Sequence, residues 1–345
     1  MNIAAQISKL KMLAVAVALA STLISCDSVI YDGEGDCSIK YRIEFEYEKN
    51  MEFADAFASK VGSVALYVFD KSGVLVEQQS QSGEALAADD YAMILELEPA
   101  EYNLLAWCGV DGKSFTTPAA TVGKTTLEQM ICTMSRKSGA EGSYVDEDLS
   151  ALFHGLKKIT YSNEPGIHTE VLSLTKNTNN FRVILQQTWS DSADAEEVDI
   201  NMFDFAIIDN NGKMDYDNSV MEDEQIVYRP WEISSGKVDI DADIYSTRAN
   251  LATVAVAEIT TARLMTDHRP MLVVTNKQSG ERVLSVPIVD YALLVKGNYN
   301  RSMDDQEYLD RQDEYNLTFF IHDGKWVSSQ IIINSWRVVL NNEII

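Results

Sequence analysis

A strand followed by a glycine-closed turn occurs twice in this chain of 345 residues, at nearly the same spacing. In the first copy Tyr41 lies in an alternating segment and Gly73 closes the turn. In the second copy Phe181 and Gly212 hold the matching positions, 140 and 139 residues later. Self-similarity over a long interval indicates a duplicated structural unit. The sequence therefore predicts two copies of one β-domain, joined near residues 162–175.

Short apolar segments separated by turn residues define the expected strands. From residue 39 to 48, apolar and polar side chains alternate, which is typical of a strand with one buried face. Hairpins are predicted at 64–76, 271–286 and 315–340, and a further pair of strands at 92–107, because a turn or breaker sequence separates the two apolar runs of each pair. Short strands with such turns favour antiparallel β-sandwiches, so the predicted fold class is all-β.

Few helices are expected. Apolar residues at helical spacing favour a short helix at 125–134, and shorter signals favour helices at 148–153 and 288–294. The first two are interpreted as connections over a sheet. The two predicted β-sandwich domains extend over residues 38–170 and 171–345.

The N-terminus has the parts of a secretory signal. Lys9 and Lys11 supply positive charge, and residues 12–24 form an almost unbroken apolar stretch that is too short to span a bilayer. The small residue Ser25 then precedes Cys26. This order predicts a lipoprotein signal cleaved between Ser25 and Cys26, with acyl chains on the Cys26 thiol and on the new N-terminus.

The mature chain is strongly acidic. Removal of residues 1–25, which contain two lysines and no acids, changes the net charge from −25 to −27. Such a charge argues against binding to nucleic acid and against direct adhesion to anionic lipid. Residues 26–37 are rich in acids and glycine and are expected to form a short acidic tether.

The cysteines signal no disulfide framework and no zinc site. Beyond Cys26 there are only Cys37, Cys108 and Cys132, and none of them has C-x-x-C spacing. One pair could form in an oxidising compartment. We favour buried free thiols for Cys108 and Cys132, because Cys108 follows a run of apolar residues.

No constellation of residues indicates catalysis, a cofactor or a metal. A zinc site usually shows a second histidine or cysteine two to four positions after a histidine, and none of the four histidines has one. They are His154, His168, His268 and His322. Two acidic groups are candidate calcium sites, namely Asp209-Asn211-Asp215 and Asp239-Asp241-Asp243. The first departs from the spacing of a calcium loop and is better interpreted as the tip of a hairpin, and the second as a solvated strand face.

Several segments together resemble a known family. They are Cys37–Tyr47, Phe53–Phe57 before the strand 63–70 with its turn 71–73, Leu97–Leu104 running into Ala106-Trp107, Leu152–Gly155, and Ile333–Trp336. In their order and spacing they resemble the FimB/Mfa-type fimbrial anchor lipoproteins of Bacteroidetes, over essentially the whole mature chain.

The resemblance implies two transthyretin-like β-sandwich domains and a non-enzymatic role at the cell outer membrane. Such proteins face outward, hold the base of a fimbrium (pilus) or limit its length, and have a fimbrial shaft subunit as partner. No small-molecule substrate is expected. The acids after the lipidated cysteine resemble the surface-export signal of this bacterial group; they are Asp27, Asp32, Glu34 and Asp36.

Subunits of this pilus class associate when a β-strand of one completes the sheet of another. The candidate strand here is the β-branched segment 331–340 near the C-terminus, with Ile331, Ile333, Trp336, Val338 and Leu340 as its association residues. The alternative is that this segment is simply the last strand of the second domain.

Shaft subunits of the class are cut after a basic residue in the first domain. The dibasic pair Lys157-Lys158 lies in a segment that looks like a strand, so we expect the first domain of this chain to stay uncut.

Two other functions remain open from the sequence. A surface lipoprotein could bind glycan or peptide through exposed aromatics such as Trp231, Trp326 or Trp336. A hydrolase would need a cleft in which two carboxylates face each other, and no sequence motif marks two Asp or Glu residues as such a pair.

Overall fold

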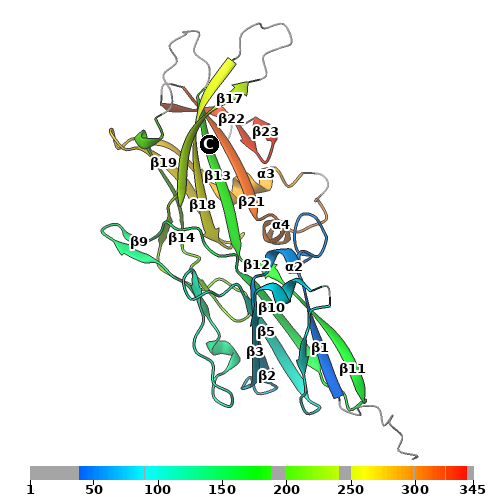
Figure 1. The fold of residues 1–345 in the computed structure, drawn as a ribbon. Coiled ribbons are helices and arrows are strands. Elements are labelled where there is room, and N and C mark those ends of the chain that lie inside the picture. Colours follow the sequence, from blue (N-terminus) through cyan, green and yellow to red (C-terminus); the bar gives the residue numbers. More distant parts are fainter. Residues whose placement is uncertain are drawn as a thin grey trace, which may run out of the picture.

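The computed structural model describes residues 39–88, 90–187, 199–240, 250–297, 300–322 and 324–339. These residues form two β-sandwiches that follow each other along the long axis of the molecule (Figure 1). The first strand begins at the end of the molecule farthest from the second sandwich (Figure 1).

The first sandwich packs a three-stranded sheet against a five-stranded sheet. The smaller sheet has the order β11-β1-β4, formed by Gly166–Ser173, Ile39–Glu46 and Met93–Leu95. The larger sheet has the order β12-β10-β5-β2-β3, formed by Thr175–Lys176, Phe153–Thr160, Glu101–Cys108, Ser63–Asp70 and Leu75–Ser82. Buried side chains such as Ile43, Leu66 and Leu104 belong to the core of this sandwich, and removing them from water stabilises it.

The second sandwich contains two six-stranded sheets. One has the order β17-β18-β13-β21-β22-β23, formed by Glu232–Ile240, Asn250–Ala262, Thr178–Gln187, Glu314–His322, Lys325–Ile333 and Trp336–Val339. The other has the order β20-β19-β14-β16-β9-β8, formed by Arg282–Pro287, Met271–Asn276, Phe203–Asp209, Ile226–Tyr228, Gly142–Val145 and Lys137–Gly139.

Both sandwiches share one strand topology. In the first sandwich one sheet contains the run β11-β1-β4 and the other contains β10-β5-β2-β3. In the second sandwich the corresponding runs are β21-β13-β18 in one sheet and β20-β19-β14-β16 in the other. The first strand of each sandwich also pairs in parallel with a strand from late in the same sandwich, β1 with β11 and β13 with β21. This agreement in order and direction confirms the duplication that the repeat spacing predicts, and the all-β fold class with it.

The alternating pattern of the sequence explains the opening strand. In β1 the side chains of Tyr41, Ile43 and Phe45 are buried, while those of Arg42 and Glu44 between them are partly exposed. Successive side chains of a strand point to opposite faces, so this pattern fits a strand with one face on the core.

Strand β5 is buried on both faces. Leu104 and Ala106 belong to the core of the first sandwich, whereas Leu105 and Trp107 belong to a second, larger core that continues into the second sandwich. The indole Nε1 of Trp107 donates to the carbonyl oxygen of Met130 at 3.1 Å. The five-stranded sheet is therefore covered on its outer face as well, by residues that follow β5 in the sequence.

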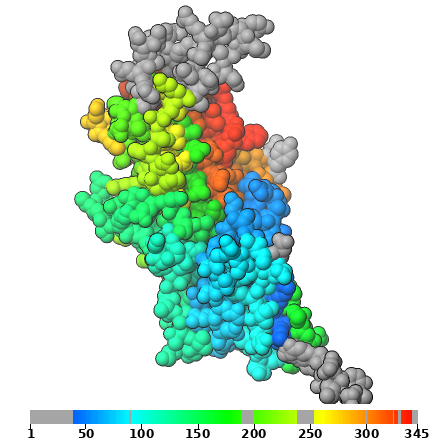
Figure 2. Space-filling model, viewed as in Figure 1, coloured from blue at the N-terminus to red at the C-terminus, as the bar shows by residue number. Residues whose placement is uncertain are grey.

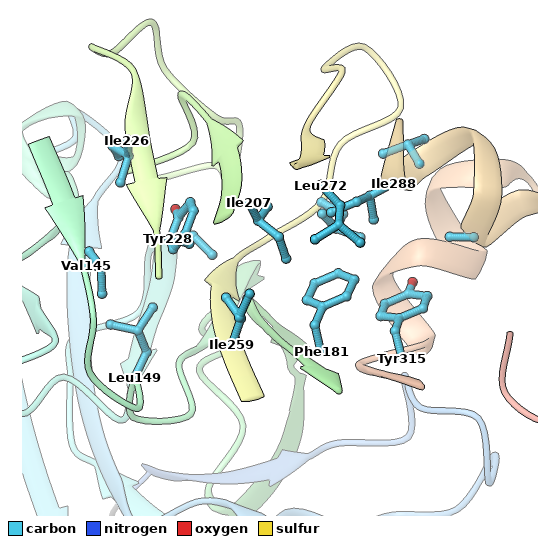
Figure 3. Close-up of a cluster of buried hydrophobic side chains, with 14 of the residues drawn as sticks. Val145, Leu149, Phe181, Ile207, Ile226, Tyr228, Ile259, Leu272, Ile288 and Tyr315 are labelled. Carbon is cyan, nitrogen blue, oxygen red and sulfur yellow. The ribbon is translucent and has the colours of Figure 1, made fainter. Parts of the chain in front are cut away.

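These covering residues belong to a segment, residues 110–149, that we term the crossing segment because it passes from the first sandwich to the second. Its strands β6 (Phe115–Thr116) and β7 (Cys132–Met134) form a small sheet with β15 (Lys213–Met214). Its strands β8 and β9 join the second sandwich through a parallel pair between β9 and β16. Figure 3 shows Val145 and Leu149 of this segment close to Tyr228 of the second sandwich.

The structure thus has no single point at which one domain ends and the other begins. The expected division at residue 170 falls inside β11, whose pairing with β1 continues to Ser173. The crossing segment lies within the range expected for the first domain, yet two of its strands extend a sheet of the second.

Two predicted hairpins are wrong. Strand β4 pairs with β1 in the small sheet, whereas β5 lies in the larger sheet, because the intervening residues 96–100 carry the chain between sheets. Strand β14 does not turn back at residues 209–212; it pairs with β16, and β15 pairs with β7 instead. The predicted hairpins β2–β3, β19–β20 and β21–β22 are confirmed.

Helices are short. The predicted helix at 288–294 is confirmed as α3 (Ile288–Leu294). The range 125–134 holds only a 3₁₀ turn, η2 (Leu127–Gln129), before β7, and the described residues 148–152 contain no helix. Other short helices are α2 (Phe57–Lys60), η1 (Glu84–Ala87), η3 (Ile200–Met202) and α4 (Asp305–Arg311).

Candidate association surface and domain junction

The predicted lipidation site lies outside the described residues. This holds for Ser25 and Cys26, and for the candidate export acids Asp27, Asp32, Glu34 and Asp36. Leu340, the last residue of the candidate association strand, lies outside them as well. Within the described part of the chain, no helix has the length and apolar character needed to cross a membrane.

The candidate association segment is a hairpin rather than one long strand. β22 ends at Ile333, the chain turns at Asn334 and Ser335, and β23 returns antiparallel with Trp336 opposite Ile333. Asn334 and Ser335 have φ values of 46° and 72°. Two successive residues with positive φ are typical of the tight turns that match the twist of a hairpin, and Asn tolerates this conformation well.

The side chain of Asn334 also fixes the turn to the sheet. Its Oδ1 accepts from the backbone N–H of Asn316 at 2.7 Å, and its Nδ2 donates to the carbonyl oxygen of Glu314 at 3.2 Å. The expectation of one continuous strand over 331–340 is therefore wrong, because this turn interrupts it.

The hairpin separates the five candidate residues into buried and exposed groups. Ile331 and Ile333 are fully buried in the core of the second sandwich, and Val338 packs against the same core. Trp336 is 63% exposed, and Val339, three residues further along β23 and on its other face, is 65% exposed. β22 thus serves its own domain, as the alternative interpretation expects, while β23 presents apolar side chains to solvent.

β23 is also the outermost strand of its sheet among the described residues. An outermost strand carries backbone N–H and C=O groups along one side that can pair with another strand. Arg337, between the exposed apolar residues, donates from Nε to Oε1 of Gln330 at 2.9 Å. This edge combines hydrogen-bonding capacity with apolar surface, which suits the addition of a strand from another protein.

A buried charge cluster lies at the junction of the two sandwiches. Asp310 of α4 accepts from Arg263 through Nε at 2.8 Å and through Nη2 at 2.8 Å, and the ammonium of Lys49 lies 2.8 Å from the same carboxylate. Burial favours the neutral acid, but Arg263 and Lys49 outweigh it and hold the pKa of the Asp310 carboxyl below its usual value.

This cluster joins the two halves of the chain, because Lys49 follows β1 and Arg263 follows β18. Sequence reasoning missed all three residues. The one available signal was Arg263, a lone arginine directly after the apolar strand that ends at Ala262.

Neutral polar groups complete the junction. The ring of His154 donates from Nε2 to the carbonyl oxygen of Tyr216 at 2.7 Å. Burial lowers the pKa of His154 to about 4, so the ring is neutral at pH 7. The side-chain amides of Asn177 and Asn218 form two hydrogen bonds, of 2.6 and 3.2 Å.

A separate groove of about 360 Å³ lies over the six-stranded sheet that ends in β23. Trp231 lines it and is 39% exposed. The polar lining includes the amides of Asn180 and Asn316, and the ion pair between Arg182 and Glu258, whose Nε and Oε1 lie 2.6 Å apart. The other two tryptophans considered as binding platforms differ, since Trp326 packs against Phe319 and Trp336 lies on β23.

The remaining candidates for chemistry do not converge. His268 contacts Asp209 at 3.4 Å, while Asn211 accepts from the hydroxyl of Tyr228 at 2.5 Å and Asp215 accepts from the N–H of Tyr216. Asp241 and Asp243 lie outside the described residues. The described chain contains no group of three His, Cys, Asp or Glu side chains placed to hold a metal.

Both described cysteines, Cys108 and Cys132, are buried free thiols, as predicted. Burial raises the pKa of Cys132 to about 12 and that of Cys108 further, so neither forms the reactive thiolate at neutral pH.

The dibasic pair lies within β10. Lys157 pairs with Glu170 at 2.7 Å and Lys158 pairs with Glu101 at 3.2 Å. Both residues are therefore part of a paired strand, and the absence of cleavage there stays a prediction.

Comparison with known proteins gives a consistent result. Minor fimbrium anchoring subunit Mfa2 of Porphyromonas gingivalis is 22% identical over 334 residues, which cover 93% of this chain and 92% of that protein. A candidate polysaccharide-binding protein of Bacteroides thetaiotaomicron is 30% identical, with a TM-score of 0.74 over 89% of this chain and 99% of that one.

The fimbrial anchor protein Mfa2 from P. gingivalis shares the fold, with a TM-score of 0.65 at 17% identity over 88% of this chain and 100% of that one. The model of the family of fimbrillin-A associated anchor proteins Mfa1 and Mfa2 matches residues 34–342. Because this match spans nearly the whole sequence, the chain belongs to the family of fimbrillin-A associated anchor proteins.

Proposed function

We propose that this chain anchors a fimbrium to the outer membrane and limits its length, with lipid on Cys26 as its attachment and the following acids as its surface-export signal. Family membership supports a cell-surface fimbrial role without catalysis. The basic and then apolar sequence of residues 1–25, which ends in the small residue Ser25 directly before Cys26, supports the lipid attachment.

One observation carries the proposal, namely the open apolar edge of β23. It lies in the second sandwich, away from the end at which β1 begins (Figure 1). A protein held at the N-terminal end would therefore present this edge away from the membrane. Trp336 and Val339 supply exposed apolar surface there.

We infer that a strand of the fimbrial shaft subunit pairs with β23. Backbone hydrogen bonds would supply much of the affinity, and contacts of alternate side chains with Trp336, Val338 and Val339 would set the register. This mode leaves β22 in place, because Ile331 and Ile333 remain in the core.

Two variants, one of them a double substitution, test the membrane end and the fimbrial end of the protein separately. In Cys26→Ala we expect the protein to leave the membrane fraction, while the matched change Cys37→Ala keeps it there. In Trp336→Ser/Val339→Ser we expect the protein to stay on the membrane while fimbriae are shed into the medium. Fimbriae retained at the normal level by the second variant would contradict association through β23.

The groove at Trp231 favours a second candidate function, glycan binding. A relative with 30% identity is described as a candidate polysaccharide-binding protein. An exposed indole flanked by amides and an ion pair offers a stacking surface together with hydrogen-bonding groups. In Trp231→Ala we expect lost retention on immobilised polysaccharide with normal fimbriation, and unchanged retention would remove this candidate.

A further inference from the structure

β1 is the strand through which any pull on the N-terminal side of the chain enters the fold. It begins at Ile39, at the end of the molecule farthest from the second sandwich, and runs toward the junction (Figure 1). All eight of its residues pair in parallel with β11, from Ile39 opposite Gly166 to Glu46 opposite Ser173. A pull along the strand axis loads these hydrogen bonds in shear, so several must break together rather than one after another.

The chain that follows β1 is fastened within itself. The carboxylate of Asp55 accepts from the N–H of Tyr47 at 2.8 Å. The side-chain amide of Asn50 donates to the carbonyl oxygens of Tyr47 and Ala54, at 2.7 and 2.8 Å. Residues 47–55, which we term the junction loop, are thus held by internal hydrogen bonds when β1 is pulled.

Helix α4 of the second sandwich binds this loop directly. Arg311 donates from Nη1 to the carbonyl oxygens of Glu48 and Asn50, at 2.9 and 3.3 Å. Its guanidinium carbon lies 4.7 Å from the centre of the Phe53 ring. The neighbouring Asp310 holds Lys49 at 2.8 Å. Figure 2 shows the blue surface of the first half directly against the orange surface of the second at this point.

α4 leads in turn into the central part of a sheet. After α4, the carbonyl oxygen of Asp313 accepts from the N–H of Asn180 at 2.8 Å, and its carboxylate pairs with Lys176 at 2.6 Å. β21 then begins at Glu314 and pairs with β13 on one side and β22 on the other. A load on α4 therefore reaches the sheet that has β23 at its edge.

We propose that the α4 clasp, made by Asp310 and Arg311 with the junction loop, transmits axial load from β1 directly into the second sandwich. The inference rests on the proposed function, because an anchored fibre is what would load the chain between these two ends. The clasp provides a load path of β1, junction loop, α4 and β21, which works beside the route through the β1–β11 pairing and the chain from β11 into β13.

Single-molecule pulling on the full mature chain tests this path. One handle is attached to Cys37 in a Cys26→Ser background and the other to Lys325→Cys at the start of β22; Cys108 and Cys132 are buried and remain unlabelled. The variant Lys49→Met/Arg311→Ala removes the contacts of both side chains and leaves the Arg263–Asp310 pair intact. At constant force we expect its first rupture to occur after a lifetime shorter by about tenfold.

Two controls isolate the path. Arg182→Ala removes an Arg–Glu pair of 2.6 Å from the same sheet but away from the clasp, and it should leave the axial lifetime unchanged. Handles at Cys37 and Lys71→Cys load the first sandwich alone, and there the double variant should behave like the parent.

An unchanged axial lifetime in the double variant would overturn the clasp, as would an equal shortening in Arg182→Ala. If the double variant fails to fold, Arg311→Lys keeps the charge but loses the two-carbonyl contact geometry, and an axial lifetime equal to that of the parent would also overturn it. The measurement uses no fimbrium, so failure of the clasp is distinguishable from failure of the anchoring function.

Discussion

The two sandwiches have the same strand order but differ in how much of their structure they supply themselves. Every described strand of the two sheets in the first sandwich comes from residues 39–176. The second sandwich takes β8 and β9 from the crossing segment, together with buried residues such as Val145 and Leu149. A duplicated framework has therefore become one structure in which the second copy depends on the first.

The larger sheet of the first sandwich and the sheet that ends in β23 differ at one edge as well. The first ends its larger sheet with β3, whose second half is polar and exposed from Ser80 to Ser82. The second ends a sheet with β23, where Trp336 and Val339 face solvent. Polar edges discourage strand addition and apolar edges favour it. Between these two edges, the comparison therefore favours β23 over β3 as the strand that binds a partner.

Separating the halves should break this dependence most severely. We expect residues 177–345, produced alone, not to fold, because β16 loses its partner β9 and the shared core loses the crossing segment. Near-ultraviolet circular dichroism and thermal unfolding measure the outcome, and production together with residues 38–176 should restore a cooperative transition. A cooperative transition of the isolated second half would contradict the dependence.

Removing the central carboxylate of the junction should have the next largest effect. Asp310→Ala leaves Arg263 buried without its carboxylate, which typically lowers the free energy of unfolding by about 3–5 kcal/mol. The matched change Asp305→Ala removes a carboxylate that is 58% exposed and lies 2.6 Å from Lys296, and we expect a loss below about 1 kcal/mol. Equal losses in urea titrations of the two variants would show that the junction contributes no special stability.

Acid should weaken the junction through His154. Its pKa is about 4 in the fold against 6.5 for the exposed group, so the unfolded chain binds the proton more readily between these values. Stability is fully present above pH 6.5 and falls as the pH drops toward 4, by about 2 kcal/mol between pH 7 and pH 5. Urea titrations of the parent and of His154→Gln at both pH values test this, since the variant should lack that part of the pH dependence.

The smallest effect on stability is expected at the open edge. Trp336→Ser should change the free energy of unfolding by no more than about 0.5 kcal/mol, because most of its side chain is already in water. Ile333→Ala, directly across the hairpin, should cost about 2–5 kcal/mol because its side chain is fully buried. A large loss in Trp336→Ser would mean that β23 serves the fold of its own domain rather than a partner.

Local patterns predicted the parts of this fold that depend on neighbouring residues. Alternation predicted β1, the sequence Asp70-Lys71-Ser72-Gly73 predicted the β2–β3 turn, and a short local signal predicted α3. α4 was readable in the same way but was missed, since Asp304 caps it by accepting from the N–H of Glu307 at 2.6 Å and Arg311 lies in its last turn.

Features set by distant residues could not be predicted. The breaker around Pro99 allows either a hairpin or a crossing between sheets, and only the packing of β4 on β1 selects the crossing. The pairing of β15 with β7, and that of β9 with β16, joins segments about 80 residues apart that have no local pattern in common. The cluster of Lys49, Arg263 and Asp310 likewise forms only once both sandwiches are in place.

The crossing segment has a consequence for how such a chain can evolve. Recombination between related genes readily exchanges domains that meet at a flexible linker, because each arrives with its own core. Here a second sandwich from another gene would arrive without strands β8 and β9 that fit it, and the resident crossing segment would face a foreign β16. The smallest unit that can be inherited or exchanged intact is therefore the pair of sandwiches.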